Sequence, residues 1–341
     1  MELQTNYTRD DYSVIVEHGA LRRLDLSVYD KAIVIIDDTV LKLHGERLQL
    51  LCSQAHIYPV AAGETLKSLS MYDQVINQII DNGVTRQSVV IAVGGGSVGD
   101  FAGFIAATLL RGVDFIQVPT TILAHDSAIG GKVGINACGG KNLIGAFKRP
   151  KAVLYDLDFL YTLPYSEKLS GFGEIIKHAM LEGEEALLAL HSDFPDRNSL
   201  KSLERIEMWL IRGMRQKLNV VQADEYEAGL RKTLNLGHTL GHAVEFHHHI
   251  PHGQAVMHGL IYATILSGRQ PDFLLSWFDA LELPNIKLSP FDDYHQLMIK
   301  DKKNSLEYIQ FILLKEHVAV EAVSEERLRA AFQILGGYYE S

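Results

Sequence analysis

Short apolar runs alternate with amphipathic segments along the first half of the chain. The runs are rich in β-branched residues and six or seven residues long, which is typical of buried strands: KAIVIID (31–37), HIYPVAA (56–62), SVVIAV (88–93) and DFIQVP (114–119). Between them, apolar positions recur with helical spacing over 68–84 and 98–110. Strands separated by helices predict a parallel sheet with helices on its faces.

The pattern changes near Leu163 and Pro164, after which most segments have helical spacing. The predicted helices are LSGFGEIIKHAMLEG (169–183), RIEMWLIRGMRQKLNVVQADE (205–225), LGHTLGHAVEF (236–246) and AVMHGLIYATILSG (255–268). Only 309–314 and 317–320 look like strands, and they predict a late hairpin. The sequence therefore predicts an α/β domain over residues 1–163 and a mainly α-helical domain over 164–341.

Composition and charge exclude several classes of protein. Of the 341 residues, 47% are hydrophobic and 22% charged, which argues against a disordered chain. The net charge of −10 argues against a nucleic-acid or membrane-surface binder, although it does not exclude a local basic pocket. The longest apolar runs, such as 101–110, are too short to span a bilayer.

The cysteine content and the N-terminus indicate the compartment. Cys52 and Cys138 are too few for a disulfide framework or a thiolate metal site. The polar N-terminal segment does not resemble a signal peptide. We therefore expect a protein of the reducing cytoplasm.

A glycine-rich turn is the first candidate binding site. Gly94, Gly96 and Gly99 satisfy the pattern G-x-G-x-x-G between a predicted strand and a predicted helix, where main-chain N–H groups can meet a pyrophosphate. A plain tight turn is the alternative. The turn lies about 90 residues into the chain, and no acidic ribose contact is clear downstream, so Asp37 and Asp38 are the better candidates. These features favour a variant of the dinucleotide-binding fold.

Acidic and histidine side chains in the second half have metal-ligand spacing. Glu174 and His178 are four residues apart, as are His238 and His242, and His252 follows. A carboxylate and two imidazoles with one open position are typical of catalytic zinc. The chain has fifteen histidines, so chance spacing with solvated or core histidines is the alternative.

Two lysines beside glycines are candidates for an anion pocket. Lys132 in GGKVGIN and Lys141 in GGKNLIG stand in predicted tight glycine loops, where the ammonium can meet phosphate or carboxylate. A solvated surface lysine is the alternative for any one of them.

Several long stretches, in this order, resemble the 3-dehydroquinate synthase family of the sugar-phosphate cyclase group. They are 94–136, GKNLIGAF (140–147), GFGEIIKHAM (171–180), RKTLNLGHTLGHAVE (231–245) and PHGQAV (251–256). The resemblance extends from KAIVIID to the DKK at 301–303. It implies a Rossmann-like NAD-binding domain followed by a helical domain that binds metal and substrate.

The resemblance also implies a role for individual residues. The implied ligands of a Zn²⁺ or Co²⁺ ion are Glu174, His238 and His252. The implied NAD contacts are Asp37, Glu64, Lys67, Gly95, Gly96, Ser97, Val98, Gly99, Asp100, Thr120, Thr121, Lys132, Lys141, Phe159 and Thr162. The implied catalytic residues are Asn142, Lys177, Arg231, Asn235 and His242, and the implied substrate contacts are Arg111, Asp126, Lys132, Lys217 and one of Lys302 and Lys303.

The chain departs from the family pattern in three places. The interval between His238 and His252 is short, which makes His249 a rival third ligand. ACGGKN (137–142) replaces a Pro-containing turn, and Met257-His258 replaces small residues. His247, His248, His249 and His258 are otherwise expected to be bystanders.

The implied reaction converts 3-deoxy-D-arabino-heptulosonate 7-phosphate to 3-dehydroquinate and phosphate. It requires NAD and one divalent metal, and a small-molecule sugar phosphate is the expected partner of a homodimer. Another sugar-phosphate cyclase is the nearer alternative, and a metal-dependent glycerol or alcohol dehydrogenase the more distant one. An inactive NAD-binding regulator is disfavoured by the intact set of Glu174, His238 and His252.

Overall fold

The computed structural model describes residues 1–4, 11–138, 140–299 and 308–340, and it divides into two compact units. The first unit is Met1–Leu163 and the second is Pro164–Ser341. Within the described residues, no helix is long and apolar enough to cross a membrane.

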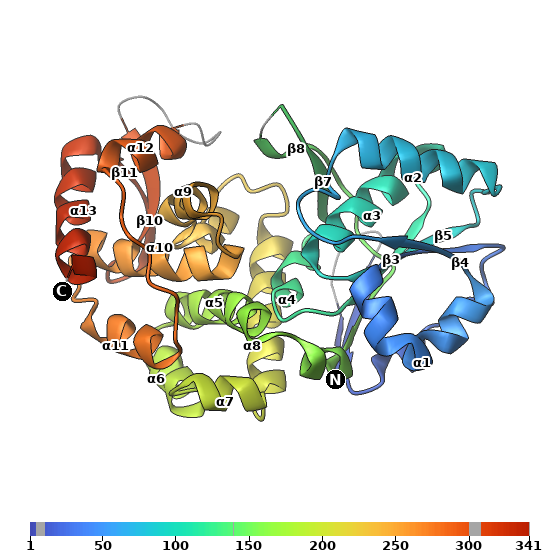
Figure 1. Cartoon of the computed structure of the whole chain (residues 1–341), viewed down its shortest axis with the longest axis horizontal. Helices are drawn as coiled ribbons and strands as arrows, with labels where there is room; N and C mark the ends of the chain where they lie inside the picture. The colour runs from blue at the N-terminus through green and yellow to red at the C-terminus, as the bar shows by residue number, and fades with distance from the viewer. Residues whose placement is uncertain (5–10, 139, 300–307, 341) are drawn as a thin grey trace. The chain divides into compact units, whose positions relative to one another are not determined.

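A seven-stranded sheet forms the centre of the first unit (Figure 1). Its order is β1-β2-β9-β6-β5-β3-β4, and every neighbouring pair is parallel except β1 and β2. The strands are β1 (Glu2–Gln4), β2 (Ser13–Glu17), β3 (Ala32–Asp37), β4 (His56–Val60), β5 (Val89–Gly94), β6 (Asp114–Pro119) and β9 (Ala152–Asp156). The four strands predicted from the apolar runs are therefore confirmed.

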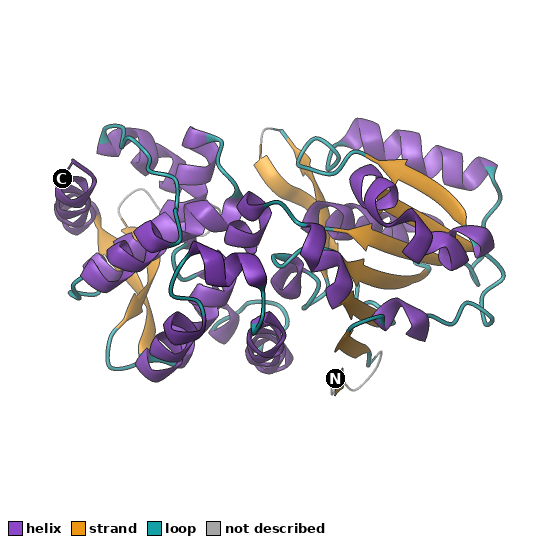
Figure 2. Ribbon diagram, turned by 60° about the horizontal axis from the view of Figure 1, so that its bottom comes forward, coloured by secondary structure: helices purple, strands orange, loops and turns teal. Residues whose placement is uncertain are grey.

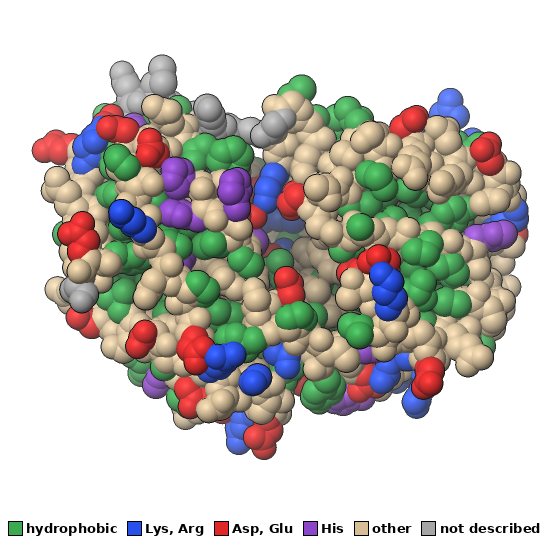
Figure 3. Space-filling model, in the orientation of Figure 1, with side chains coloured by type: hydrophobic (Ala, Val, Ile, Leu, Met, Phe, Trp, Pro, Cys, Tyr) green, Lys and Arg blue, Asp and Glu red, His purple; other side chains and the backbone are tan. Residues whose placement is uncertain are grey.

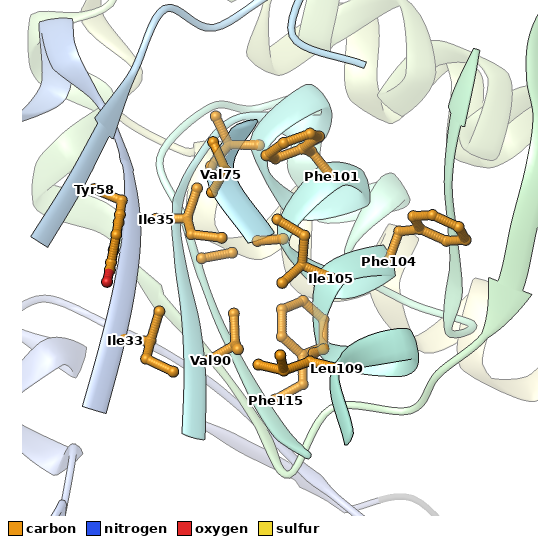
Figure 4. Close-up of a cluster of buried hydrophobic side chains, with 14 of the residues drawn as sticks. Ile33, Ile35, Tyr58, Val75, Val90, Phe101, Phe104, Ile105, Leu109 and Phe115 are labelled. Carbon is orange, nitrogen blue, oxygen red and sulfur yellow. The ribbon is translucent and has the colours of Figure 1, made fainter. Parts of the chain in front are cut away.

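Helices cover both faces of this sheet, as Figure 2 shows. They are α1 (Asp38–Gln54), α2 (Leu69–Asp81), α3 (Gly96–Thr108), the short α4 (Ala124–Ser127) and the 3₁₀ turns η1 (Ala20–Arg23), η2 (Leu109–Arg111) and η3 (Leu157–Thr162). Ile33 and Ile35 of β3 pack with α2 and α3 in the cluster of Figure 4, whereas Val34 and Ile36 pack with α1 on the other face. Burial on both faces explains why β3 reads as a continuous apolar run.

The strand order reverses between β3 and β5. The chain passes from β3 outward to β4, returns to β5 on the other side of β3, and continues to β6. Ligands of open α/β sheets bind outside the carboxyl ends of the strands at such a switch point. Asp37 ends β3 and Gly94 ends β5, so both candidate dinucleotide contacts lie at this edge.

The lysine-bearing glycine stretches form a hairpin, so the prediction of tight glycine loops there was wrong. Strand β7 (Lys132–Ala137) pairs antiparallel with β8 (Gly140–Phe147), and both pack against α3. The two backbones approach closely, because a Cβ on Gly134 would lie 2.7 Å from the Ile144 carbonyl oxygen. Glycine is therefore required for strand contact here, although it is depleted in most strands.

The second unit is mainly helical. Its helices are α5 (Tyr165–Glu182), α6 (Glu184–Asp193), α7 (Arg197–Ser202), α8 (Ile206–Ala223), α9 (His238–His248), α10 (His252–Leu266), α11 (Asp272–Ala280), α12 (Phe291–Ile299) and α13 (Glu325–Glu340), with the 3₁₀ turn η4 (Leu230–Asn235). The predicted hairpin is confirmed as β10 (Tyr308–Leu314) and β11 (Val318–Ser324). Helix α10 is buried along its length and packs against α5, α9 and α13 (Figure 1).

Candidate functional site

Glycines bring three helices of the second unit into close contact. A Cβ on Gly253 of α10 would lie 1.6 Å from the Ser170 carbonyl oxygen of α5, and one on Gly259 would lie 1.9 Å from the Gly237 carbonyl oxygen at the start of α9. Only glycine permits such an approach. Because Glu174, His238 and His252 stand within four residues of these contacts, their side chains are positioned by main-chain packing.

The three predicted metal ligands converge. The Glu174 Oε1 atom lies 3.3 Å from the His238 Nε2 atom and 3.3 Å from the His252 Nε2 atom. His242, one turn after His238 on α9, has its ring centre 5.2 Å from that of His238 and 5.6 Å from that of His252. Ligand atoms of the three histidines lie within 4.8 Å of one another. Figure 3 shows histidine side chains gathered on this unit.

The far ring nitrogens of two of these histidines have acceptors. The His238 Nδ1 atom is 3.1 Å from the Leu236 carbonyl oxygen, and the His252 Nδ1 atom is 3.0 Å from the Glu245 Oε2 atom. In the neutral imidazole, an Nδ1–H that donates to such an acceptor leaves the Nε2 atom, which faces Glu174, with the lone pair that a metal would bind. A carboxylate behind a ligating histidine is a recurrent feature of zinc sites.

Charge in the cluster is balanced by Lys177, whose Nζ atom lies 2.5 Å from the Glu174 Oε2 atom. Burial raises the pKa of the Glu174 carboxyl, but the charges of Lys177 and His238 oppose it and hold the pKa well below its usual value. Burial lowers the pKa of His238 to about 4. Burial also opposes the charge on His252, but contacts with Glu174 and Glu245 outweigh it and raise the pKa to about 9. A cation would therefore compete with a proton at His252.

The donor set fits one divalent ion. Both Glu174 carboxylate oxygens are buried, and neither accepts a hydrogen bond of normal geometry from the residues that the structure describes. Two ligand atoms about 2.0 Å from an ion at a tetrahedral angle are about 3.3 Å apart, which matches both Glu174–histidine separations. Two imidazoles with one carboxylate are a donor set of catalytic zinc, and iron(II) also uses it. Metal binding by these three residues stays a prediction.

The other histidine candidates do not belong to the cluster of His238, His242 and His252. His249 is exposed and ends α9 in a left-handed conformation at φ 53°, so it does not lie among the ligands as His252 does. His247 bonds the Ser289 hydroxyl, His248 bonds the Tyr294 hydroxyl, and His178 bonds Gln216. The short connection between α9 and α10 is therefore compatible with His252 as the third ligand.

The predicted substrate residues of the second unit are on neighbouring elements. Turn η4, which carries Arg231 and Asn235, packs against α5 and α8, the helices of Lys177 and Lys217. Arg231 is buried and donates to the Glu225 carbonyl oxygen, and the Asn235 amide donates to Glu227 over 2.9 Å. His242 is exposed. Lys302 and Lys303 lie outside the described residues.

The glycine turn of the first unit is closely packed. A Cβ on Gly95 would lie 3.1 Å from Thr121, one on Gly96 would lie 3.0 Å from Ser127, and one on Gly99 would lie 2.9 Å from Gln117. Val98 is buried in the first turn of α3. Thr120 follows β6 at the same edge, and its hydroxyl is buried without a hydrogen-bond partner in the described part of the chain. A buried donor of this kind fits a bound ligand at the turn.

A second group of predicted NAD contacts surrounds the turn. The Lys67 Nζ atom bonds the Asp100 Oδ2 atom over 2.7 Å, the Gly63 amide donates to the Ser97 hydroxyl over 3.0 Å, and Lys141 lies 3.7 Å from Glu64. Asn142 accepts a hydrogen bond from Lys67. The structure therefore brings cofactor and substrate candidates together within Met1–Leu163.

Other predicted residues of this unit have roles in the fold. The Asp37 carboxylate caps α1 by accepting from the Thr39 amide over 2.8 Å. Phe159 is buried in the core, and the Thr162 hydroxyl is 2.8 Å from the His44 Nε2 atom. The remaining candidates are Arg111, exposed at φ 71°, Asp126 in α4, and Lys132, exposed at the start of β7.

Sequence reasoning missed two residues that organise these sites. Glu245 supports His252, and its place seven residues after His238 on one helix face is a signal that could have identified it. Asn136 connects the β7–β8 hairpin to residues 64–67, and no local pattern indicates this role.

Comparison with known proteins identifies the family. Two family profiles match the chain: 3-dehydroquinate synthase N-terminal over residues 57–170 and 3-dehydroquinate synthase C-terminal over 171–304. The 3-dehydroquinate synthase of Macrococcus caseolyticus (strain JCSC5402) is 48% identical over 349 residues, which cover 98% of each chain.

Solved structures with the same fold are more distant in sequence. A 2-deoxy-scyllo-inosose synthase complexed with carbaglucose-6-phosphate, NAD⁺ and Co²⁺ has a TM-score of 0.86 at 24% identity, covering 98% of this chain and 99% of that one. An iron-containing alcohol dehydrogenase from Thermotoga maritima has a TM-score of 0.67 at 15% identity, covering 95% and 97%. These likenesses show the α/β fold with a helical second unit. By the family profiles and the full-length identity, the chain is an enzyme that belongs to the 3-dehydroquinate synthase family.

Proposed function

We propose that this enzyme converts 3-deoxy-D-arabino-heptulosonate 7-phosphate to 3-dehydroquinate and phosphate, with NAD and one divalent metal. The observation that carries the proposal is the convergence of Glu174 with the Nε2 atoms of His238 and His252, 3.3 Å from each. The reaction is a carbon–oxygen lyase step with no net oxidation. The carbon–oxygen bond to phosphate breaks, and an internal aldol step forms the ring.

Residues of the second unit hold and tune the metal position. Glu174, His238 and His252 would bind the ion, which when bound supplies a Lewis acid for a substrate hydroxyl oxygen. Lys177 keeps the Glu174 carboxyl ionised, and Glu245 holds His252 in the tautomer whose Nε2 atom accepts. His242, exposed beside the ligands, is the candidate for moving a proton, because an imidazole can change its charge near neutral pH.

Residues of the first unit would bind the dinucleotide. NAD supplies a hydride acceptor that is restored within each turnover. Main-chain N–H groups at the start of α3 would meet its pyrophosphate, the Thr120 hydroxyl would find a partner, and Asp37 would accept from a ribose hydroxyl. We propose accordingly that Met1–Leu163 is the NAD-binding domain and Pro164–Ser341 the metal- and substrate-binding domain.

Charged and amide side chains would bind the sugar phosphate. The first unit offers Lys132, Asn142 and Arg111 as donors for phosphate or carboxylate, and the second unit, taken by itself, offers Lys217, Arg231 and Asn235. The sugar phosphate's reacting groups would then be held near their attack geometry, which is a large part of the catalysis of an internal ring closure.

The decisive assay uses catalytic NAD. Purified enzyme is incubated with Zn²⁺ or Co²⁺, substoichiometric NAD and the heptulosonate phosphate, and phosphate release is followed. We expect many turnovers per NAD without accumulation of NADH. Absence of phosphate release would refute the proposal. NADH formation in proportion to glycerol or another simple alcohol would instead support a dehydrogenase.

Two further proposals concern the state of the enzyme. We propose a homodimer, which light scattering would report as twice the 38.0 kDa chain mass and which a monomer mass would refute. We also propose a cytoplasmic location, supported by the two cysteines Cys52 and Cys138, both free. Fractionation of the source cells would test the location.

A further inference from the structure

We propose that Lys67 is a positioning residue that couples the glycine turn to Asn142, so that NAD at the turn and sugar phosphate at the β7–β8 hairpin change each other's affinity. The inference rests on the proposed function, which assigns NAD to Gly94–Asp100 and substrate to Asn142. It adds an energetic connection within the first unit that neither assignment contains.

The first step is the place of the Lys67 ammonium. Its side chain is 4% exposed, and a buried ammonium is tolerated only when it is paired. An ammonium has three donors and no acceptor, and here it donates to Asp100 of α3 and to Asn142 of β8. One cation therefore joins the helix behind the glycine turn to the hairpin.

The second step is the conformation of Asn142. Ile135 pairs with Ile144 and Ala137 pairs with Gly140, so Asn136 alone stands opposite residues 141–143. This bulge holds Asn142 at φ 53°, a left-handed conformation that non-glycine residues seldom adopt. Bulges often redirect a side chain next to an active site. The bulge thus sets the orientation of the Asn142 side chain, and we expect this orientation to change when the hydrogen bond from Lys67 changes.

The third step is that the main chain of the same segment holds this bulge. The Asn136 amide donates to the Lys67 carbonyl oxygen over 2.7 Å, and the Asn136 side-chain oxygen accepts from the Asn142 amide over 2.9 Å. The Asn136 side-chain amide also donates to Glu64 over 2.8 Å. The Asn142 side chain therefore contacts Lys67 directly, and the Asn142 backbone is connected to Lys67 through Asn136.

These contacts imply reciprocal binding. A pyrophosphate bound at the start of α3 would displace the part of the helix that carries Asp100. Because Lys67 donates to both Asp100 and Asn142, a displacement of the Asp100 carboxylate would also move Asn142. Coupling between two binding events is equal in both directions and is typically about 5- to 150-fold. We expect a factor of about ten here.

Hydrogen exchange tests the coupling without catalysis. In the wild type, NAD should slow amide exchange in the hairpin, residues 132–147, as well as in the glycine turn. Because Lys67 is itself an implied NAD contact, Lys67→Met is compared at an NAD concentration raised until exchange in the turn is slowed as in the wild type, and exchange in the hairpin should then be unchanged. Asp100→Asn provides a second variant that keeps the lysine, and it should lose the hairpin response in the same way. Lys151→Met is the matched control, because it removes only an exposed 3.7 Å ion pair with Asp114.

Steady-state kinetics then distinguish a positioning role from a structural one. At saturating NAD, Lys67→Met and Asn142→Ala should each raise the KM for the heptulosonate phosphate about tenfold. If Lys67 acts through Asn142, the double variant should match Asn142→Ala to within about twofold, since the same interaction is lost once. Multiplication of the two effects would overturn the inference, and Lys151→Met should behave as the wild type.

The outcomes separate this inference from the proposed function. A wild type that releases phosphate but shows no NAD effect on the hairpin keeps the function and refutes the coupling. A wild type that releases no phosphate but shows a hairpin response dependent on Lys67 refutes the function and keeps the coupling.

Discussion

The contact between Gly253 and Ser170 gives the sharpest test of the second unit. A Cβ at position 253 would lie 1.6 Å from the Ser170 carbonyl oxygen, whereas real Cβ contacts are essentially never shorter than 3.0 Å. Gly253→Ala must therefore move α10 away from α5 by about 1.4 Å, the difference between these distances. No rotamer change can relieve the contact, because backbone stands on both sides.

The energetic cost follows from that displacement. Overpacking of a core typically costs about 1–3 kcal/mol, and a backbone clash belongs at the upper end or beyond. The hydrogen bond from the Gly253 amide to the Ser170 hydroxyl, 3.0 Å long, adds about 1 kcal/mol if it breaks. We expect Gly253→Ala to lower the free energy of unfolding by about 3 kcal/mol or more.

The same displacement would act on the proposed metal position. His252 precedes Gly253, and Glu174 is one turn after Ser170, so separation of the helices would lengthen the 3.3 Å between their ligand atoms. Tetrahedral zinc does not tolerate an increase of this size. We therefore expect the variant to lose bound zinc during dialysis while the wild type retains it.

Denaturant unfolding monitored by fluorescence, with zinc measured by atomic emission, would check both effects. Gly336→Ala is the control, because among the described residues nothing outside its chain neighbours and the nearby backbone of α13 lies within 4 Å of its Cβ position. Its unfolding free energy should stay the same or rise by about 0.5–1 kcal/mol. The nearest contact of a Cβ on Gly241 is 3.1 Å, so the loss of unfolding free energy in Gly241→Ala should lie between those of Gly253→Ala and Gly336→Ala. A stable Gly253→Ala variant with full zinc content would refute the close approach.

Three further variants test other parts of the structure. Glu245→Gln should weaken zinc binding about 10- to 100-fold in a chelator competition, because His252 loses its carboxylate support; unchanged affinity would contradict that role. Ser68→Ala should cost about 1 kcal/mol of stability by removing the cap of α2, and urea unfolding would measure it. Burial raises the pKa of Asp158, but hydrogen bonds from His18 and Arg47 outweigh it and lower the pKa. The wild type should therefore lose stability as pH falls below about 3.9, and Asp158→Asn should give a flatter curve there in urea titrations; parallel curves would contradict this.

The local sequence pattern was sufficient to predict strands that are buried on both faces of the sheet and helices that carry their own cap and apolar face. The run 31–37 could be read as a strand because its side chains are buried on both faces of the sheet. The 68–84 segment could be read as a helix because Ser68 caps it and its apolar residues share one face. Both signals depend only on neighbours in the sequence.

The β7–β8 hairpin could not be predicted from the local sequence pattern. Gly134 and Gly145 lower the strand propensity of the segment, yet each is needed because a Cβ would lie 2.7 Å from a carbonyl oxygen of the opposite strand. The approach of Gly253 to Ser170 likewise joins residues 83 positions apart. Family resemblance, not spacing, named Glu174, His238 and His252 together, because spacing alone left His178 and His242 as equal candidates.

The two candidate sites are held by different kinds of contact, and this difference determines how each should respond to mutation. Around the proposed metal position, main-chain glycine contacts fix the helices that carry the proposed ligands, so a substitution there should change stability and metal content together. Around the glycine turn, side-chain hydrogen bonds of Lys67, Asp100 and Asn142 connect two segments that the sheet already holds in place. Substitutions in that network should therefore change affinities, and those that leave the buried Lys67 ammonium without its Asp100 partner should also cost stability. The ratio of the two effects should accordingly differ between Lys67→Met, which removes the charge, and Asp100→Asn, which leaves it unpaired.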